Sequence, residues 1–402
     1  MRAGWEIVKL DEVISFERGL TYAKGDEVAY SSVGVLRSNN VDLTTQSLNL
    51  DEIKYLREDF EVPPKKKVRK SSLLMCMSNG SKDHLGKVAL IDRELDYAFG
   101  GFMGLLTPDE GKVFPKYLYY ALASKSFKDY IHSLADGANI NNLKYKDLAA
   151  FDILLPSLAE QQHIVDILDQ EFAKIDTLKA NAEKSLQAAK NLFSSALSSE
   201  LRHRAGWKET KIGDFCEIIR GKRFVRADMV EQGVPCIHYG DIYTHYGLYA
   251  TKAKGCVSPD LAKKLRFAHK NDVIVVAAGE NRLDIGVGVA WLGDEPAVVH
   301  DACFILKHSQ NPMFLSFYFR SAEYHQYLKD EVNEGKICSF LTKPLAEARI
   351  SLPSLVEQEQ IVKRLIIVSN NCTTLQQNYQ KTLALCDDLK QAILRKAFNG
   401  EL

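Results

Sequence analysis

The chain repeats itself once, with a period of about 200 residues. Gly4-Trp5 returns as Gly206-Trp207, and the Leu-Pro-Ser-Leu of residues 155–158 returns at 352–355. Glu-Gln and then Ile-Val follow both copies of Leu-Pro-Ser-Leu. Solenoid proteins have repeats of only about 20–50 residues. The longer period therefore predicts a duplicated pair of large modules.

Each repeat has two parts that differ in their apolar pattern. Short β-type runs broken by Gly and Asn turns fill about 150 residues, with a helical stretch near their end. A long helical pattern follows each Leu-Pro-Ser-Leu. We therefore predict an α+β fold with mixed domains at 1–155 and 202–352, and long helices at 156–201 and 353–402.

Both predicted long helices carry an apolar seam. Apolar residues recur every 3.5 residues over four heptads without Pro or Gly, which is typical of a coiled coil. We predict that the two helices pack antiparallel, as rods of about 60 Å. The alternative is that each is an ordinary amphipathic helix covering its own domain. The predicted seam and partner-interface residues are Val165, Leu168, Phe172, Ile175, Leu186, Phe193, Leu365, Val368, Leu375, Tyr379, Leu389 and Ile393.

No sequence pattern for catalysis or metal binding stands out. The chain has no GxxxxGK[ST] loop, no HExxH, and no CxxC among its eight cysteines. Asn311-Pro312-Met313-Phe314 has a faint likeness to the adenine-methyltransferase motif, but Met occupies the third position and no Gly-rich turn precedes it. No apolar stretch approaches the ~20 residues of a membrane span, and the start does not read as a secretory signal. We expect a cytoplasmic, non-enzymatic protein without a metal site.

Two unlike modules on a rigid spacer suggest recognition of a long, two-part ligand such as DNA. Lys and Arg total 52, as do Asp and Glu, so the formal charge is zero and any DNA-reading face must be local. In the first repeat we single out a polar run that can pair with purine edges, a basic run, and one further lysine. They are Arg37, Ser38, Asn39 and Asn40; Lys65, Lys66, Lys67 and Arg69; and Lys82.

In the second repeat the candidates surround Gly221 and the loop that matches residues 37–40. They are Arg220, Lys222, Arg223 and Arg226, with His238 and Tyr239. The alternative for each cluster is a solvent-exposed loop without a binding role. For residues 64–70, a nuclear-localisation signal has the same composition. Two domains that recognise different DNA sequences would share a scaffold and differ in their loops, which is the pattern of the two repeats.

With these segments in order, the chain resembles the specificity subunit of type I restriction–modification enzymes. The likeness is carried by residues 155–165 and 352–362, by the long helices after them, and by the openings Gly4-Trp5…Arg18-Gly19 and Gly206-Trp207…Arg220-Gly221. It covers essentially the whole chain.

The resemblance implies that each α+β module is a target-recognition domain and that the pair binds a bipartite, asymmetric double-stranded DNA site. The helices would set the spacing and dock two methyltransferase subunits, which use S-adenosylmethionine to methylate adenine at N6. Restriction subunits, which use ATP and Mg, would join the assembly. This chain itself would hold no cofactor. Two rival classes stay open: a coiled-coil scaffold that does not bind DNA, and a standalone DNA methyltransferase.

Overall fold

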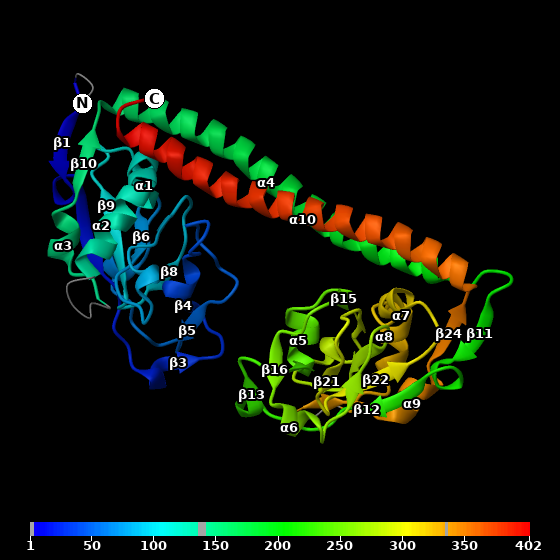
Figure 1. Cartoon of the computed structure of the whole chain (residues 1–402). Coiled ribbons are helices and arrows are strands. Elements are labelled where there is room, and N and C mark those ends of the chain that lie inside the picture. Colours follow the sequence, from blue (N-terminus) through cyan, green and yellow to red (C-terminus); the bar gives the residue numbers. More distant parts are fainter. Residues whose placement is uncertain (1–3, 136–141, 334–336) are drawn as a thin grey trace. The chain divides into compact units, whose positions relative to one another are not determined.

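The computed structural model describes residues 4–135, 142–333 and 337–402 (Figure 1). The chain divides into two compact units. Unit 1 comprises residues 1–182 and 381–402, and unit 2 comprises residues 183–380. Each unit holds one α+β domain together with part of each long helix, because α4 (Leu158–Leu201) and α10 (Leu355–Phe398) both run unbroken across the boundary.

The α+β domain of unit 1 is built on two four-stranded sheets. Their strand orders are β2-β9-β6-β7 and β3-β5-β4-β8. The central strand β6 (Leu73–Cys76) is buried at all four positions, as its continuous apolar sequence predicts. The other strands are β2 (Ile14–Arg18), β3 (Glu27–Val28), β4 (Val33–Leu36), β5 (Lys54–Leu56), β7 (Val88–Leu90), β8 (Tyr97–Phe99) and β9 (Met103–Pro108).

The domain of unit 2 repeats this topology with one more strand in each sheet. Its orders are β12-β22-β18-β20-β15 and β13-β16-β14-β21-β17, and in both units the second sheet contains one parallel pair, β4–β8 or β14–β21. The strands are β12 (Glu217–Arg220), β13 (Met229–Val230), β14 (Val234–Ile237), β15 (Tyr249–Ala250), β16 (Gly255–Val257), β17 (Phe267–Ala268), β18 (Val273–Val276), β20 (Gly288–Trp291), β21 (Ala297–Val299) and β22 (Cys303–Lys307). The predicted duplication and α+β class are confirmed.

Short helices and two-stranded ribbons complete each domain. The ribbons pair the first and last strands, β1 (Glu6–Lys9) with β10 (Asp152–Leu155) and β11 (Lys208–Lys211) with β24 (Arg349–Leu352). A further ribbon in unit 2 pairs β19 (Ala278–Gly279) with β23 (Cys338–Ser339). The short helices are α1 (Pro115–Ala123), α2 (Lys125–Ala135), α3 (Tyr145–Ala149), α5 (Tyr239–Thr244), α6 (Pro259–Ala262), α7 (Pro312–Tyr318), α8 (Ala322–Leu328) and α9 (Thr342–Glu347).

A buried glutamine ties each long helix to its own domain. The Gln161 side chain accepts a hydrogen bond from Phe114 N at 2.7 Å and donates to Lys112 O and Pro156 O. Gln358 accepts from Asn311 N at 2.9 Å and donates to Pro353 O. Both side chains are fully buried. Since a buried polar group must be paired, the repeated Glu-Gln marks a structural joint.

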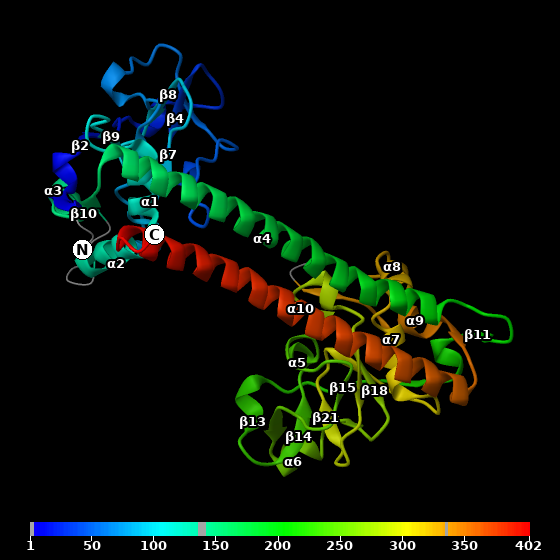
Figure 2. The ribbon, with the colours of Figure 1, turned by 90° about the horizontal axis from the view of Figure 1, so that it is seen from above.

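The two long helices pack against each other within each unit, and Figure 2 shows them side by side. In unit 1, Lys179 pairs with Asp387 at 2.8 Å and Lys390 with Asp176 at 2.5 Å. In unit 2, Arg364 forms two hydrogen bonds to Glu200, at 2.9 and 2.8 Å. Partner numbers fall along α10 as they rise along α4, so the packing is antiparallel, as predicted.

The observed seam follows the prediction on α4 and departs from it on α10. On α4 the seam side chains Val165, Leu168 and Ile175 are buried and Phe172, Leu186 and Phe193 are half-buried. On α10 Leu365 is buried and Val368, Tyr379 and Ile393 are half-buried.

The remaining two α10 residues, Leu375 and Leu389, lie outside the seam, whereas their predicted place in a partner interface stays a prediction. Leu375 and Leu389 are 38% and 47% exposed. The side chains one position later, Gln376 and Lys390, are half-buried instead. The lattice of Leu365, Cys372, Tyr379, Cys386 and Ile393 can pair with residues either three or four positions on. The prediction took the stripe three positions on, which is the more apolar one. The less exposed stripe on the helix is the one four positions on, Ser369, Gln376, Leu383, Lys390 and Ala397.

The ends of the two long helices also pack on the α+β domains. The alternative prediction, that each helix covers its own domain, is therefore confirmed in part. Ile164, Val165 and Leu168 belong to the core of unit 1 together with Leu394 and Ala397 of α10. Within the described ranges, no helix is long and apolar enough to span a membrane.

Candidate nucleic-acid interface

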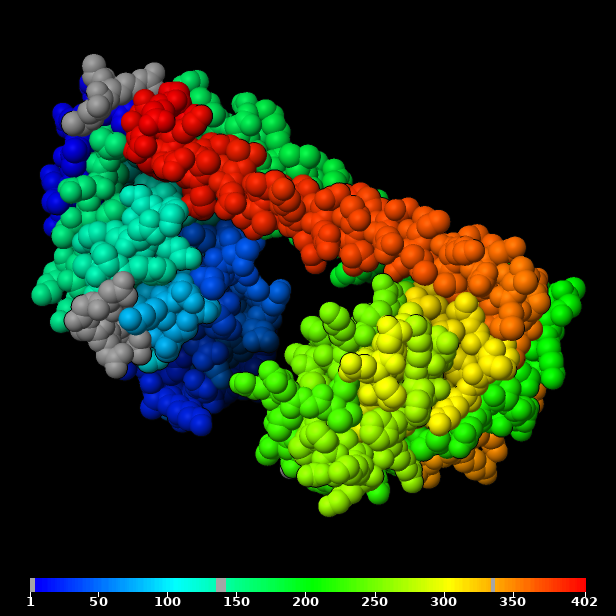
Figure 3. Space-filling view, in the orientation of Figure 1, coloured from blue at the N-terminus to red at the C-terminus, as the bar shows by residue number. Residues whose placement is uncertain are grey.

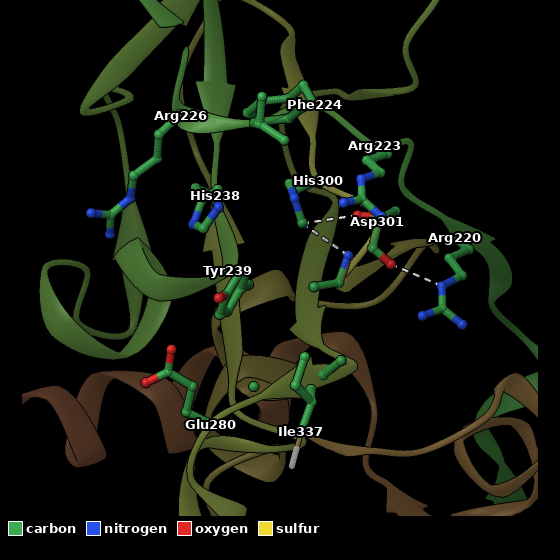
Figure 4. Close-up of a pocket in the computed structure, with 14 residues that line it drawn as sticks. Arg220, Arg223, Phe224, Arg226, His238, Tyr239, Glu280, His300, Asp301 and Ile337 are labelled. Atoms are coloured by element: carbon green, nitrogen blue, oxygen red, sulfur yellow. Dashed lines mark hydrogen bonds and ion pairs between the residues drawn. The ribbon is translucent and has the colours of Figure 1, made fainter. Parts of the chain in front are cut away.

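A cavity of about 890 Å³ lies in unit 2 where four strands end (Figure 4). β12 ends at Arg220, β14 is followed by His238, β18 leads into β19 and Glu280, and β21 is followed by His300. Five of the six candidates from the second repeat line it. The lining residues are Arg220, Arg223, Phe224, Val225, Arg226, His238, Tyr239, Ala278, Gly279, Glu280, His300, Asp301, Ala302 and Ile337.

Gly221 permits the close backbone approach that forms one wall of the cavity. A Cβ there would lie 2.1 Å from the His300 carbonyl oxygen, so no other residue fits without a shift of backbone. Arg220, the preceding residue, donates from Nε to Asp301 O at 2.8 Å. The Arg-Gly pair of the repeat therefore braces the loop after β21.

The wall beyond this brace is aromatic. The rings of Phe224 and His300 lie 5.2 Å apart, those of His238 and His300 4.6 Å, and those of His238 and Tyr239 4.4 Å. Burial lowers the pKa of both histidines below the ordinary value, so both rings carry less positive charge near neutral pH than exposed histidines do. Such a group of rings can stack on a base or a sugar face.

Two arginines supply charge that the protein itself does not neutralise. Arg223 and Arg226 are exposed, and neither forms an ion pair with any residue that the structure describes. Lys222 differs, because its ammonium donates to Lys264 O at 2.8 Å and it does not line the cavity. We therefore remove Lys222 from the candidate contacts.

In unit 1 the candidate run 37–40 follows β4, the counterpart of β14. Asn40 is 1% exposed, its amide donates to Asn49 O and Glu52 O, and its oxygen accepts from Arg37 N. Its prediction as a base contact is wrong, since its hydrogen-bonding groups are used inside the fold. Ser38 is half-buried and accepts from Asn79 Nδ2 at 2.8 Å. Arg37 is half-buried and Asn39 exposed.

The basic run of unit 1 is partly committed to internal pairs. Lys66 binds the Glu17 carboxylate and donates to Arg18 O at 2.6 Å, and this ammonium lowers the pKa of Glu17. Lys66 is therefore already paired inside the fold, which argues against its prediction as a phosphate contact. Lys67 pairs with Asp96 at 2.5 Å, in an exposed contact that DNA could replace. Lys65, Arg69 and Lys82 are exposed.

The first domain contains the same brace as the second. Arg18 Nε donates to Gly101 O at 3.2 Å, and a Cβ on Gly19 would lie 1.9 Å from Gly100 O. The backbone at this strand end is thus repeated, whereas Gly100 stands where unit 2 has His300.

Comparison with known proteins agrees with this duplicated architecture. A family model described as "Type I restriction modification DNA specificity domain" matches the chain twice, over residues 2–188 and 204–384. The chain belongs to this family. The type I specificity subunits StySPI of Salmonella potsdam and EcoKI of Escherichia coli K12 are 25% and 23% identical to it, over 99% of this chain and 89% of each relative.

Solved structures share the fold at low sequence identity. A chain from a study of complex assembly and conformational transition of the type I R-M system matches with a TM-score of 0.80 at 20% identity, covering 100% of this chain and 99% of that one. The HsdS subunit from Thermoanaerobacter tengcongensis matches with a TM-score of 0.61 at 20% identity, covering 100% and 98%.

Membership of the specificity-subunit family makes the chain a DNA-recognition subunit and not itself an enzyme, as predicted. Asn311, in the faint methyltransferase likeness, caps α7 by accepting from Met313 N and Phe314 N. Glu280 and His300 are not among the contacts predicted from the sequence. The repeat alignment could have found them, because the loops after equivalent strands converge on one site.

Proposed function

We propose that this chain reads a bipartite, asymmetric DNA site, with one half bound by each α+β domain. The observation that supports this proposal most directly is that the same backbone framework occurs in both domains, with different side chains at its strand ends. Arg18 and Arg220 brace both loops, while Gly100 in unit 1 corresponds to His300 in unit 2. Two copies of one scaffold with different exposed chemistry suit two different half-sites.

In unit 2 the proposed contacts fall into two kinds. Arg223 and Arg226 would neutralise phosphates or pair with guanine edges. His238 and Tyr239 would pack against bases or sugars from the aromatic wall. In unit 1 the proposed contacts are Arg37, Asn39, Lys65, Lys67, Arg69 and Lys82, with Ser38 at the edge of the site.

The long helices would fix the half-site spacing and dock two methyltransferase subunits. In Figure 3 the near face of α10 is not covered by any other segment among the residues that the structure describes. Large apolar side chains stay exposed on both helices, which is usual for a surface that another protein covers. They are Leu178, Leu192, Ile367, Leu375, Leu385 and Leu389. The partners would bring S-adenosylmethionine, and restriction subunits would bring ATP and Mg, in the cytoplasm.

The test is selection of bound duplexes from a random pool by the chain in complex with its methyltransferase partner. We expect two short, unlike conserved blocks separated by a spacer of fixed length. A scaffold would select nothing, which would overturn the proposal. Methylation of DNA by the isolated chain, without partner, would instead support a standalone methyltransferase.

The spacing role has a separate test. Seven residues inserted after Leu186 in α4 and after Gln380 in α10 preserve both seams, because seven is one heptad. Each insertion lengthens its helix by about 10 Å, so we expect a spacer longer by about three base pairs. A spacer of unchanged length would show that the long helices do not set the distance between the half-sites.

A further inference from the structure

Two carboxylates line the cavity of unit 2, and they differ in whether they have a partner. Asp301 lies 3.2 Å from His300 Nδ1. Glu280, just after β19, is exposed and makes no hydrogen bond or ion pair with any residue that the structure describes. Figure 4 shows its carboxylate pointing into the space below Arg226 and His238. Its two oxygens are therefore available to a ligand.

A free carboxylate is unfavourable opposite a DNA backbone. Each strand carries one negative charge about every 3.4 Å, and like charges repel. The arginines of the same cavity draw that backbone in. A base edge is different, because the cytosine N4 amino group is a hydrogen-bond donor in the major groove and carboxylates accept from it.

The two bases that carry an amino group in the major groove are not equivalent partners. Adenine places the N7 acceptor beside its N6 donor, and this acceptor would face the second carboxylate oxygen. Cytosine presents only the N4 donor on that edge. A carboxylate with two free oxygens thus favours cytosine.

We infer that Glu280 selects a cytosine in the half-site read by unit 2, through a hydrogen bond from the N4 amino group to its carboxylate. The inference rests on the proposed function and adds the base class that this cavity reads. The matching position after β6 in unit 1 is Gly80, which has no side chain to do the same. This contact would be one source of asymmetry between the half-sites.

The test compares Glu280→Ala and Glu280→Gln with the unchanged chain, each in complex with the methyltransferase partner, by selection from random duplex pools. Glu280→Ala should lower discrimination at a single cytosine by about ten-fold, the size of one base contact, and leave the other positions unchanged. Glu280→Gln should shift that position toward adenine, because an amide matches the adenine N6 and N7 pair.

Glu295→Gln is the matched control, since this exposed glutamate precedes β21 and the cavity lies after it. It should leave the motif unchanged. An unchanged motif in Glu280→Ala, or uniformly tighter binding from relief of repulsion, would overturn the inference while leaving the proposed function intact. Failure of the unchanged complex to select any motif would overturn the proposed function as well.

Discussion

The strand-end loops of the two units differ in side chains far more than in backbone. Gly19 and Gly221 both allow a close approach to the carbonyl of the loop after the matching strand, β8 or β21. Beyond that approach the chemistry diverges, because unit 2 places His300 and Glu280 where unit 1 has Gly100 and Gly80. Backbone close approach constrains residue type strictly, whereas an outward-facing side chain is free to change with the ligand. A duplicated reader can therefore keep its framework and vary its target.

The largest effect should come from exchanging a whole domain. Replacing residues 1–155 by the equivalent module of a relative should change one half of the selected DNA motif completely and leave the other half and the spacer intact. Sequencing of selected duplexes measures both halves at once. Altered bases in both halves would mean that the two domains do not read independently.

The next effect concerns the helix ends, which are buried alike in both units. Leu168→Ala and Leu365→Ala each remove a fully buried side chain, so each should cost about 2–5 kcal/mol. Hydrogen exchange should rise in β6 and β9 for Leu168→Ala, and in β18 and β22 for Leu365→Ala. Leu178→Ala, at a 55% exposed position, is the control and should have little effect. Equal loss of protection in both units from one substitution would show that they unfold together.

A smaller effect is expected from the free cations of unit 2. Arg223→Ala with Arg226→Ala should weaken DNA binding by about ten-fold or more and lower the salt dependence by about two phosphate contacts. Titrations of the complex at several salt concentrations measure both quantities. Lys270→Ala is the control, because Lys270 pairs with Asp294 and precedes β18, away from the cavity. An unchanged salt slope in the double variant would exclude phosphate contacts by these arginines, and an unchanged affinity as well would exclude them from the interface.

The smallest effect is on pH dependence, and it should be confined to the half-site of unit 2. Burial lowers the pKa of His238 and His300, so DNA affinity should stay flat from about pH 7 to 8 and rise a few-fold below about pH 6, as the rings gain charge. Histidines with a lowered pKa also make the fold less stable on acidification, because the unfolded chain takes up the protons more readily. The measurement therefore stays above about pH 5.

His238→Gln with His300→Gln should remove that rise in affinity. Binding to the half-site of unit 1 should show no such rise, since Arg37 follows the strand there in place of a histidine. A rise that survives the double substitution would place the titrating group elsewhere.

Much of the architecture could be predicted from the sequence because the repeat and the 3.5-residue period are both long-range patterns. The seam of α10 could not be assigned fully, since its first apolar lattice fits two partner lattices and the choice depends on packing against α4. Asn40 and Lys66 were selected for their residue type, but burial and the Glu17 carboxylate turn both inward. Conversely, Glu280 carries no local signal and is recognised only where four strand ends meet.

The most direct test of the account is the motif selected from random DNA by the intact complex. If each domain reads its own sequence through its own strand-end loops, the two halves of the selected motif must differ. The account predicts two different short blocks, separated by a spacer whose bases are unselected and whose length is constant. A single uninterrupted motif, or two identical halves in a palindrome, would contradict it.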